Sequence, residues 1–321
     1  MVAFKDLKQA QTTIAPYIKH TPLIESDFLS ELIQGKVYLK LENQQVTHAF
    51  KIRGVMNKLL NLTEHEKARG IITASAGNHG QAVAFGAQKR GFSSKIVIPK
   101  RTPQVKADGI RQFGAELLFY GDTYTEAELK AKQIAVQEEL LYVSPYNDEL
   151  IVAGHGSIGL EILMDLPTVN AVVVPVGGGG LIAGISIAVK NQKPDTQVIG
   201  VQSHVSPVMF ESLKAGKIVP AHGHERYTIA EGLAGGIEKN SITFGIILQH
   251  VNEVLLVREE SIRHAVCQIW KSMAQKIEGS GSVGIALLQE NPELFKGKTL
   301  ALIVTGGNID DSLFENLLAE D

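Results

Sequence analysis

The sequence has little cysteine and no long apolar run. Its single cysteine, Cys267, cannot form an internal disulfide, and its place in a helical pattern with Ile262 and Val266 indicates a buried side chain rather than a nucleophile. No segment reaches the roughly 18 apolar residues of a membrane span. The start, Met1–Ala10, lacks the basic and apolar stretches of an export signal. We therefore expect a cytoplasmic protein with no membrane partner.

An excess of charge of one sign is also missing. The 31 Lys and Arg residues nearly balance the 34 Asp and Glu residues, and the net charge of -3 gives no long-range attraction to nucleic acid. Aromatic residues make up only 6% of the chain, whereas hydrophobic residues make up 44%, which is typical of a globular protein with a large core. A small molecule is the expected partner.

Short β-branched runs alternate with amphipathic helical patterns along the chain, which indicates an α/β fold with helices on both faces of parallel strands. The length of 321 residues suits two domains, and a ligand cleft is expected at their boundary. Thr63 and Glu66 have capping-box spacing, and Gly91 and Gly114 stand where helical patterns end. The expected strands are Val37–Leu41, Ile71–Ser75, Lys95–Ile98, Leu117–Tyr120, Ala171–Val176, Val198–Gln202, Val254–Val257 and Leu300–Thr305.

One apolar strand runs into four consecutive glycines, followed by a helix that begins near Leu181. Glycines allow backbone N–H groups to approach an anion, and the following helix start adds unpaired donors, so this segment is typical of a phosphate site. A plain tight turn is the alternative. A dinucleotide site would need an acid after the next strand, which instead ends in Gln202-Ser203. The four glycines are Gly177, Gly178, Gly179 and Gly180.

A lysine, Lys51, lies close to the expected start of another helix. A cation is mildly unfavourable there because of the helix dipole. The Lys51 side chain is therefore either an ordinary solvated side chain or one that is held in this place for a function. A lysine that is partly desolvated has a lowered pKa, which Schiff-base chemistry requires.

Two further strands end in small or polar residues. The strand Ile71–Ser75 leads into a turn and an expected helix, Gln81–Arg90, where Ser75 and Asn78 could bind a carboxylate or Asn78 could merely cap the helix. Thr305 follows the last apolar strand, and it either faces a ligand or is an ordinary turn residue.

These motifs together resemble the threonine dehydratase and serine racemase family of pyridoxal-phosphate enzymes. The resemblance rests on Phe50-Lys51-Ile52-Arg53-Gly54, Ser75-Ala76-Gly77-Asn78-His79, the four glycines and Thr305-Gly306-Gly307-Asn308. It implies a tryptophan synthase β-like fold of type II, with two doubly wound α/β domains and a cofactor cleft between them. The large domain would comprise 1–63 and 147–321, and the small mobile domain 64–146. It also implies a homodimer.

The resemblance also implies a role for each site residue. Lys51 would carry pyridoxal 5'-phosphate as a Schiff base, with Phe50 packed beside it. The phosphate would bind at the four glycines and Leu181, the 3-hydroxyl at Asn78 and the pyridine nitrogen at Thr305. The substrate loop would comprise Ser75, Ala76, Gly77, Asn78 and His79.

The implied reaction is α,β-elimination of water from L-threonine or L-serine, which yields a 2-keto acid and ammonia, with Lys51 as the base for the α-proton. A hydroxyl partner such as Thr305 does not hold the ring nitrogen protonated, and this favours loss of the β-hydroxyl over transamination. Since the chain ends soon after its last expected strand, we expect no regulatory domain and a catabolic role.

Several alternatives stay open. Racemases of the family have a serine where this chain has Ala76, so serine racemisation is less favoured than dehydration. No metal is predicted, because Gln202 stands where the divalent site of the racemases has a glutamate, although Glu278 could serve elsewhere. The scattered His204, His222 and His224 are expected to be solvated. The remaining alternatives are a threo-3-hydroxyaspartate dehydratase, a β-replacing synthase, an NAD-binding dehydrogenase and a non-catalytic binding protein.

Overall fold

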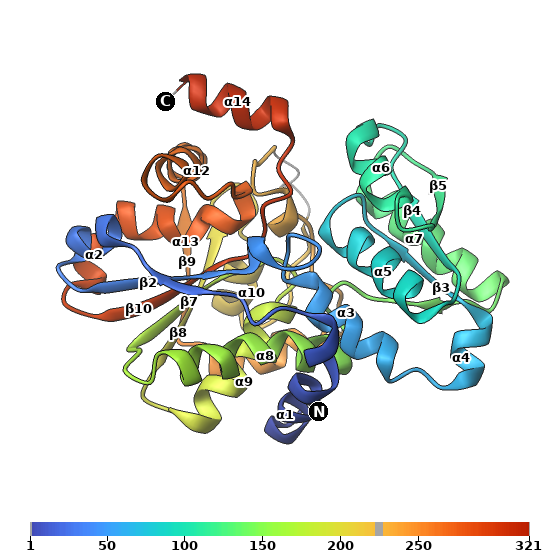
Figure 1. The fold of residues 1–321 in the computed structure, drawn as a ribbon, viewed down its shortest axis with the longest axis horizontal. Coiled ribbons are helices and arrows are strands. Elements are labelled where there is room, and N and C mark those ends of the chain that lie inside the picture. Colours follow the sequence, from blue (N-terminus) through green and yellow to red (C-terminus); the bar gives the residue numbers. More distant parts are fainter. Residues whose placement is uncertain (1, 222–226, 321) are drawn as a thin grey trace.

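The computed structural model describes residues 2–221 and 227–320, which form two α/β units side by side (Figure 1). The larger unit is built around a six-stranded sheet with strand order β1-β2-β10-β7-β8-β9, and the smaller unit around a four-stranded sheet with order β5-β4-β3-β6. The strands of the larger sheet come from both ends of the described chain, whereas those of the smaller sheet lie between Ile71 and Tyr142. No helix in the described ranges is long and apolar enough to span a membrane.

The strands agree with the sequence prediction except at two short edges. Every expected strand is present, with ends that differ by at most one residue. The prediction missed β1 and β6, which have three and two residues. All strand pairs are parallel apart from β1 and β2. The strands are β1 (Leu23–Glu25), β2 (Lys36–Leu41), β3 (Ile71–Ala74), β4 (Ser94–Ile98), β5 (Glu116–Phe119), β6 (Leu141–Tyr142), β7 (Ala171–Pro175), β8 (Gln197–Ser203), β9 (Glu253–Val257) and β10 (Thr299–Val304).

Both faces of the larger sheet are buried. Alternate residues of β7 belong to different cores: Val173 lies in one, and Val172 and Val174 lie in the other. Helices α2, α12 and α13 lie on the first face, with α14 packed outside α12 (Figure 1). Helices α8, α9, α10 and α11 lie on the second face, with α1 packed outside α8 and α9. The helices are α1 (Phe4–Ile14), α2 (Asp27–Ile33), α8 (Glu149–Asp165), α9 (Gly180–Gln192), α10 (Val208–Ala215), α11 (Ile242–His250), α12 (Glu259–Met273), α13 (Gly279–Glu290) and α14 (Asp311–Glu320).

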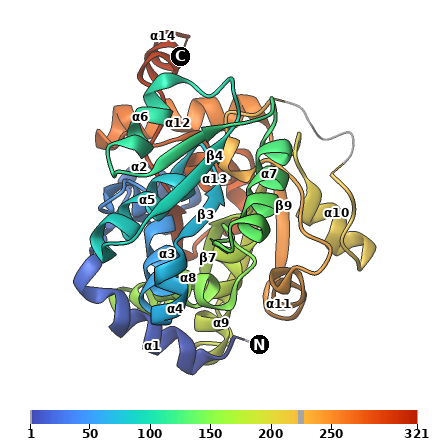
Figure 2. The same ribbon diagram turned by 90° about the vertical axis from the view of Figure 1, so that its right-hand side faces the viewer.

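The smaller sheet is likewise covered on both faces. Figure 2 shows α5 and α7 on the two sides of β3 and β4, and Ile71 and Ile72 accordingly pack into different cores. Thr63 and Glu66 form the predicted capping box at the start of α4. Gly91 ends α5 with a φ of 74°, a left-handed conformation that glycine adopts without steric cost. The helices of this unit are α4 (Glu64–Arg69), α5 (Asn78–Arg90), α6 (Gln104–Arg111) and α7 (Tyr124–Gln137).

Helix α3 (Lys51–Leu60) lies between the two units (Figure 1). Its side chains Val55, Met56 and Leu59 belong to the core that also contains Ile71 and Ile96 of the smaller sheet. On its other side, glycines allow a close crossing with α8, because a Cβ on Gly154 would overlap the α3 backbone. The first residue of α3 therefore begins a helix that contacts both units.

A buried ion network anchors α3 to the larger unit. The Arg53 side chain is fully buried and donates to Glu42 Oε2 at 2.8 Å and to Glu161 Oε1 at 2.6 Å. Lys40, also fully buried, adds a second cation at 2.6 Å from Glu161 Oε2. Burial alone would raise the pKa of Glu161, but the charges of Arg53 and Lys40 outweigh it and hold this pKa below its usual value. Arg53 is therefore a structural residue that joins α3 to the larger unit.

We expect Arg53→Met to lower the free energy of unfolding by about 3–5 kcal/mol, because the substitution leaves two buried carboxylates without their shared partner. The measurement is the denaturation midpoint in guanidinium chloride. The matched control is Arg263→Met, which removes an arginine that pairs with Glu320 at 3.9 Å on the surface and should cost less than about 1 kcal/mol. Equal midpoints for the two variants would contradict the assigned role.

Candidate active site

Lys51 is the first residue of α3, the helix that packs between the two units. Its Nζ donates to the backbone oxygen of Pro145 at 2.9 Å, which is the only hydrogen bond the amine makes to the described residues. Loss of solvent lowers the pKa of Lys51 to about 8, while the nearby Glu278 opposes this shift. The structure therefore supports the desolvated alternative for this lysine, and its amine is neutral at a lower pH than that of a surface lysine.

The end of strand β10 lies directly beside the start of α3. The Phe50 N–H donates to the Thr305 backbone oxygen at 3.0 Å, and the Gly307 N–H donates to His48 O at 2.9 Å. The Thr305 side chain is 2% exposed, and its Oγ1 has no hydrogen-bond partner among the described residues. A buried hydroxyl without a partner is costly, so Thr305 is placed to bind a polar ligand atom rather than to form an ordinary turn.

Asn78 reaches from the smaller unit to the larger one. Its Nδ2 donates to Glu278 Oε1 at 2.8 Å, and its Oδ1 accepts from Asn308 Nδ2 at 2.7 Å. The expected helix start at Gln81 is wrong, because α5 begins at Asn78 itself with Gly77 as its N-cap. The Asn78 side chain does not cap its helix, so the capping alternative is also wrong.

The four glycines follow β7 and lead into α9, which begins at Gly180, with Leu181 buried in its first turn. The structure adds a reason for glycine that the sequence did not provide. A Cβ on Gly178 would overlap the ring of Tyr146, and a Cβ on Gly180 would lie 3.0 Å from Tyr146 Cα. Gly179 has a φ of 89° and is left-handed, which strains any other residue type. Tyr146 thus packs against the loop, beside the oxygen that Lys51 contacts.

The predicted substrate loop follows β3 as expected. Ser75 Oγ accepts from the Gly77 N–H at 3.2 Å, and a Cβ on Gly77 would meet no atom within 4 Å, so this turn is open on one side. Ala76 packs against the apolar core of the smaller unit. The His79 ring is buried with Nε2 3.1 Å from Val143 O, and burial together with the charge of Lys51 lowers the pKa of His79 to about 3. His79 is therefore a neutral residue that supports the loop from inside.

Sequence reasoning considered Glu278 only as a stray metal ligand, and it missed Tyr146. Burial raises the pKa of Glu278 to about 7, although its hydrogen bond from Asn78 acts in the opposite direction. The Glu278 N–H donates to Gly306 O at 3.0 Å, which fixes this residue beside the end of β10. The only sequence feature that could have pointed to Glu278 is its position as a single acid directly before the small residues that begin α13. Strongly shifted pKa values cluster at functional sites, which places Glu278 in the candidate site.

Ion pairs join the two units around these residues. Lys106 of α6 pairs with Glu231 of the larger unit, and Lys132 of α7 pairs with Glu238 at 2.9 Å. The Glu238 N–H also donates to the Tyr146 hydroxyl at 2.9 Å. The segment 231–238 is thereby held against the smaller unit next to the glycine loop.

The arrangement fits pyridoxal 5'-phosphate on observations of this chain alone. It provides a desolvated amine at Lys51, a buried hydroxyl without a partner at Thr305, an amide at Asn78 and a glycine turn at a helix N-terminus. These groups match the aldehyde, ring nitrogen, 3-hydroxyl and phosphate of that cofactor. Among the residues that the structure describes, no three His, Cys, Asp or Glu side chains are grouped to hold a metal ion.

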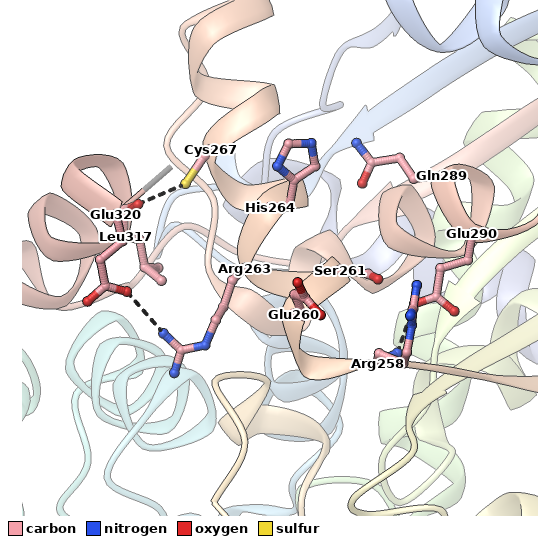
Figure 3. A pocket seen from close by; sticks show the side chains of 10 residues that line it. All are labelled: Arg258, Glu260, Ser261, Arg263, His264, Cys267, Gln289, Glu290, Leu317 and Glu320. Carbon is pink, nitrogen blue, oxygen red and sulfur yellow. Dashed lines mark hydrogen bonds and ion pairs between the residues drawn. The ribbon is translucent and has the colours of Figure 1, made fainter.

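A surface depression of about 460 Å³ lies elsewhere, between α12, the end of α13 and α14 (Figure 3). Its side chains are largely engaged with each other, since Arg263 pairs with Glu320 and Arg258 with Glu290. Cys267 at its base is buried and donates to Leu317 O at 3.3 Å, which confirms the packing role predicted for this cysteine. None of the candidate residues lines this depression. His222 and His224 lie outside the described residues, while His204 Nδ1 lies 3.3 Å from Val257 O.

Comparison with known proteins identifies relatives over almost the whole chain. A family model described as "Pyridoxal-phosphate dependent enzyme" matches residues 14–306. The chain is 40% identical over 319 residues to the L-threonine ammonia-lyase of Thermotoga maritima, and the match covers 99% of this chain and 78% of that protein.

Solved structures share the fold. The processed form of threonine deaminase isoform 2 from Solanum lycopersicum has a TM-score of 0.91 and 33% identity, with 98% of this chain and 93% of that chain covered. The serine racemase of Dictyostelium discoideum has a TM-score of 0.89 and 33% identity, with 96% of this chain and 99% of that chain covered. The sequence-based prediction of the fold is confirmed.

We expect Gly178→Ala to destabilise the protein by about 1–3 kcal/mol, because the added methyl group must displace the Tyr146 ring. Thermal unfolding measures the effect. The double variant Gly178→Ala with Tyr146→Ala should recover part of the loss, since the smaller side chain leaves space for the methyl group. If the stability loss of the double variant equals the sum of the losses of the two single variants, contact with Tyr146 is not the reason for glycine at position 178.

Proposed function

Because the chain belongs to the family of pyridoxal-phosphate-dependent enzymes, we propose that it is a lyase that eliminates water from L-threonine or L-serine and releases a 2-keto acid and ammonia. The observation that carries the proposal is the desolvated Lys51 amine, next in sequence to Phe50, whose N–H donates to the backbone of Thr305. The Thr305 hydroxyl has no hydrogen-bond partner among the described residues. The relatedness to an L-threonine ammonia-lyase and to a threonine deaminase supports this reaction over the others that the fold allows.

The chain's own residues would hold the cofactor at four points. Lys51 would bind its aldehyde carbon, Asn78 its 3-oxygen and Thr305 its ring nitrogen, with Phe50 packed beside them. The phosphate would be held by the glycine turn and the start of α9. When bound, the cofactor supplies an electron sink that stabilises negative charge at the substrate α-carbon. The glycine turn comprises Gly177, Gly178, Gly179 and Gly180, followed by Leu181.

Lys51 is the base for the substrate α-proton in this proposal. Its lowered pKa provides neutral amine near pH 8, where an ordinary lysine is almost fully protonated. Lys51 is also the first residue of a helix packed on both sides, so Nζ is held close to one location. The substrate carboxylate would be received by Ser75, Ala76, Gly77, Asn78 and His79, whose turn lies at the N-terminus of α5.

Serine racemisation is the second candidate, and the similarity to a serine racemase favours it. Racemisation needs a proton donor on the face of the substrate opposite Lys51. Ala76 has no ionisable group or hydroxyl, so this position cannot supply the proton. Dehydration requires no such donor, and this difference makes it the first choice.

We also propose the finer organisation from family resemblance. Residues 64–146 would form the small mobile domain, and 1–63 with 147–321 the large one, with α3 as the element against which both pack. The protein would work as a cytoplasmic homodimer without nucleic-acid or membrane partners. Light scattering of the purified chain at several concentrations tests the dimer.

Purified protein incubated with pyridoxal phosphate should release 2-oxobutanoate from L-threonine and pyruvate from L-serine. Lys51→Ala should lower the turnover number by about 10³-fold and abolish the absorption band of the lysine-bound cofactor, because the amine is both the attachment point and the base. Lys58→Ala removes a lysine from the same helix that pairs with Asp148 at 2.7 Å, and it should retain the band and the activity. A Lys51→Ala variant with full activity would exclude the proposal.

Ala76→Ser tests the choice between elimination and racemisation. With L-serine the unsubstituted protein should form pyruvate with little D-serine. The added hydroxyl should raise the ratio of D-serine to pyruvate by about tenfold or more, because it supplies a proton donor at the second face. Chiral chromatography and a keto-acid assay give the two product amounts. Abundant D-serine from the unsubstituted protein would favour the racemase.

A further inference from the structure

The orientation of the Asn78 amide is determined by two partners in the larger unit. Asn308 gives one Nδ2 hydrogen to Thr47 O at 3.0 Å and the other to Asn78 Oδ1 at 2.7 Å. Thr47 O is a backbone carbonyl and can only accept, which fixes Asn308 as a donor. The oxygen of Asn78 must therefore face Asn308.

Glu278 imposes the same orientation from the other side. Its Oε1 accepts from Asn78 Nδ2 at 2.8 Å, and above its pKa of about 7 this carboxylate has no hydrogen to donate. The carboxylate is itself held in place, since the Glu278 N–H donates to Gly306 O and a Cβ on Gly306 would lie 2.7 Å from Glu278 Oε1. An inverted Asn78 amide would place oxygen against oxygen here and N–H against N–H at Asn308.

One hydrogen of the Asn78 amide remains available. The amide nitrogen carries two hydrogens, of which Glu278 accepts one, and no acceptor for the second occurs among the residues that the structure describes. A Cβ on Gly306 would lie 3.1 Å from this nitrogen, so the amide is beside the end of β10, next in sequence to Thr305, whose Oγ1 has no hydrogen-bond partner among the described residues. The free hydrogen and this hydroxyl thus come from neighbouring positions of one site.

We infer that Glu278 and Asn308 are positioning residues that hold the Asn78 amide with its N–H toward the 3-oxygen of the bound cofactor, so that Asn78 donates to this oxygen and never accepts from it. The inference rests on the proposed function, since it requires pyridoxal phosphate in the site. A donated hydrogen bond stabilises the ionised form of the 3-oxygen. Glu278 and Asn308, which do not touch the cofactor, would thus disfavour protonation of its 3-oxygen.

Charged groups of three elements face Glu278. Glu231, next to α13, raises the pKa of Glu278, while Lys106 of α6 and Lys51 of α3 lower it. Burial is the largest influence and brings this pKa to about 7. Glu278→Gln removes the charge and keeps an oxygen that accepts from Asn78, whereas Glu278→Ala removes both. The two variants separate the hydrogen bond from the charge.

The test compares holoenzymes reconstituted with pyridoxal phosphate. The readouts are the cofactor dissociation constant, from fluorescence titration, and the position of the absorption band between pH 6 and 9. Glu278→Ala and Asn308→Ala should each raise the dissociation constant about tenfold and shift the band toward that of the cofactor with a protonated 3-oxygen. Glu278→Gln should keep the dissociation constant and band of the unsubstituted protein at pH 8, because the glutamine oxygen still accepts from Asn78 Nδ2 and the amide keeps both of its hydrogen bonds, whereas each alanine variant removes one of them. The double variant Glu278→Gln with Asn308→Ala leaves the amide free to invert and should show the shift.

Glu290→Gln is the matched control, since Glu290 lies at the other end of α13, pairs with Arg258 and makes no bond to Asn78, and it should leave both readouts unchanged. If Glu278→Ala, Asn308→Ala and the double variant all keep the original band and affinity, the inference is overturned while keto-acid release upholds the proposed function. Asn78→Asp provides a further variant if an alanine variant fails to fold, because its carboxylate can only accept, and an unchanged band would overturn the inference. Absence of cofactor binding by the unsubstituted protein would overturn both.

Discussion

The position of Lys51 depends on the ion network around Arg53, two residues further along the same helix. Arg53 is shared by Glu42, which follows β2, and by Glu161 of α8, so one guanidinium ties three segments of the larger unit together. A buried charge of this kind is tolerated only when its partners are in place, which makes the arrangement specific rather than merely stable. The other face of α3 packs into the core of the smaller unit. The helix that begins at Lys51 is consequently held by charge on one side and by apolar packing on the other.

The glycine loop shows how one residue type can satisfy two requirements. Backbone N–H groups at the start of α9 suit an anion, and for that purpose the absence of side chains is enough. In this chain Gly178 and Gly180 also make room for Tyr146, which in turn accepts from the Glu238 N–H. Tyr146 is adjacent in sequence to Pro145, whose carbonyl contacts the Lys51 amine. The loop and the amine are therefore linked through a tyrosine that no sequence motif marks.

Most of the fold could be predicted from the sequence, because the eight longer strands are apolar runs bounded by glycine, proline or polar residues. The edge strands β1 and β6 were missed because two or three residues carry no periodic signal. The start of α5 was placed three residues late since Asn78 and His79 are polar and break the apolar pattern. Glu278 could not be identified for another reason: its partner Asn78 lies 200 positions away in the sequence, and only folding brings the two together. Local patterns thus located the elements, while the contacts between elements determined which polar side chains share a site.

Asn78 belongs to the segment that we assign to the smaller unit, yet both of its hydrogen-bond partners belong to the larger one. A ligand that bonds to this amide can bind fully only when the two units are in contact. Thermodynamic linkage makes this effect reciprocal. If contact between the units raises the affinity for the ligand by some factor, the bound ligand raises the equilibrium constant for that contact by the same factor. If the units move relative to each other, as proposed for residues 64–146, the same amide would couple occupancy of the site to that movement.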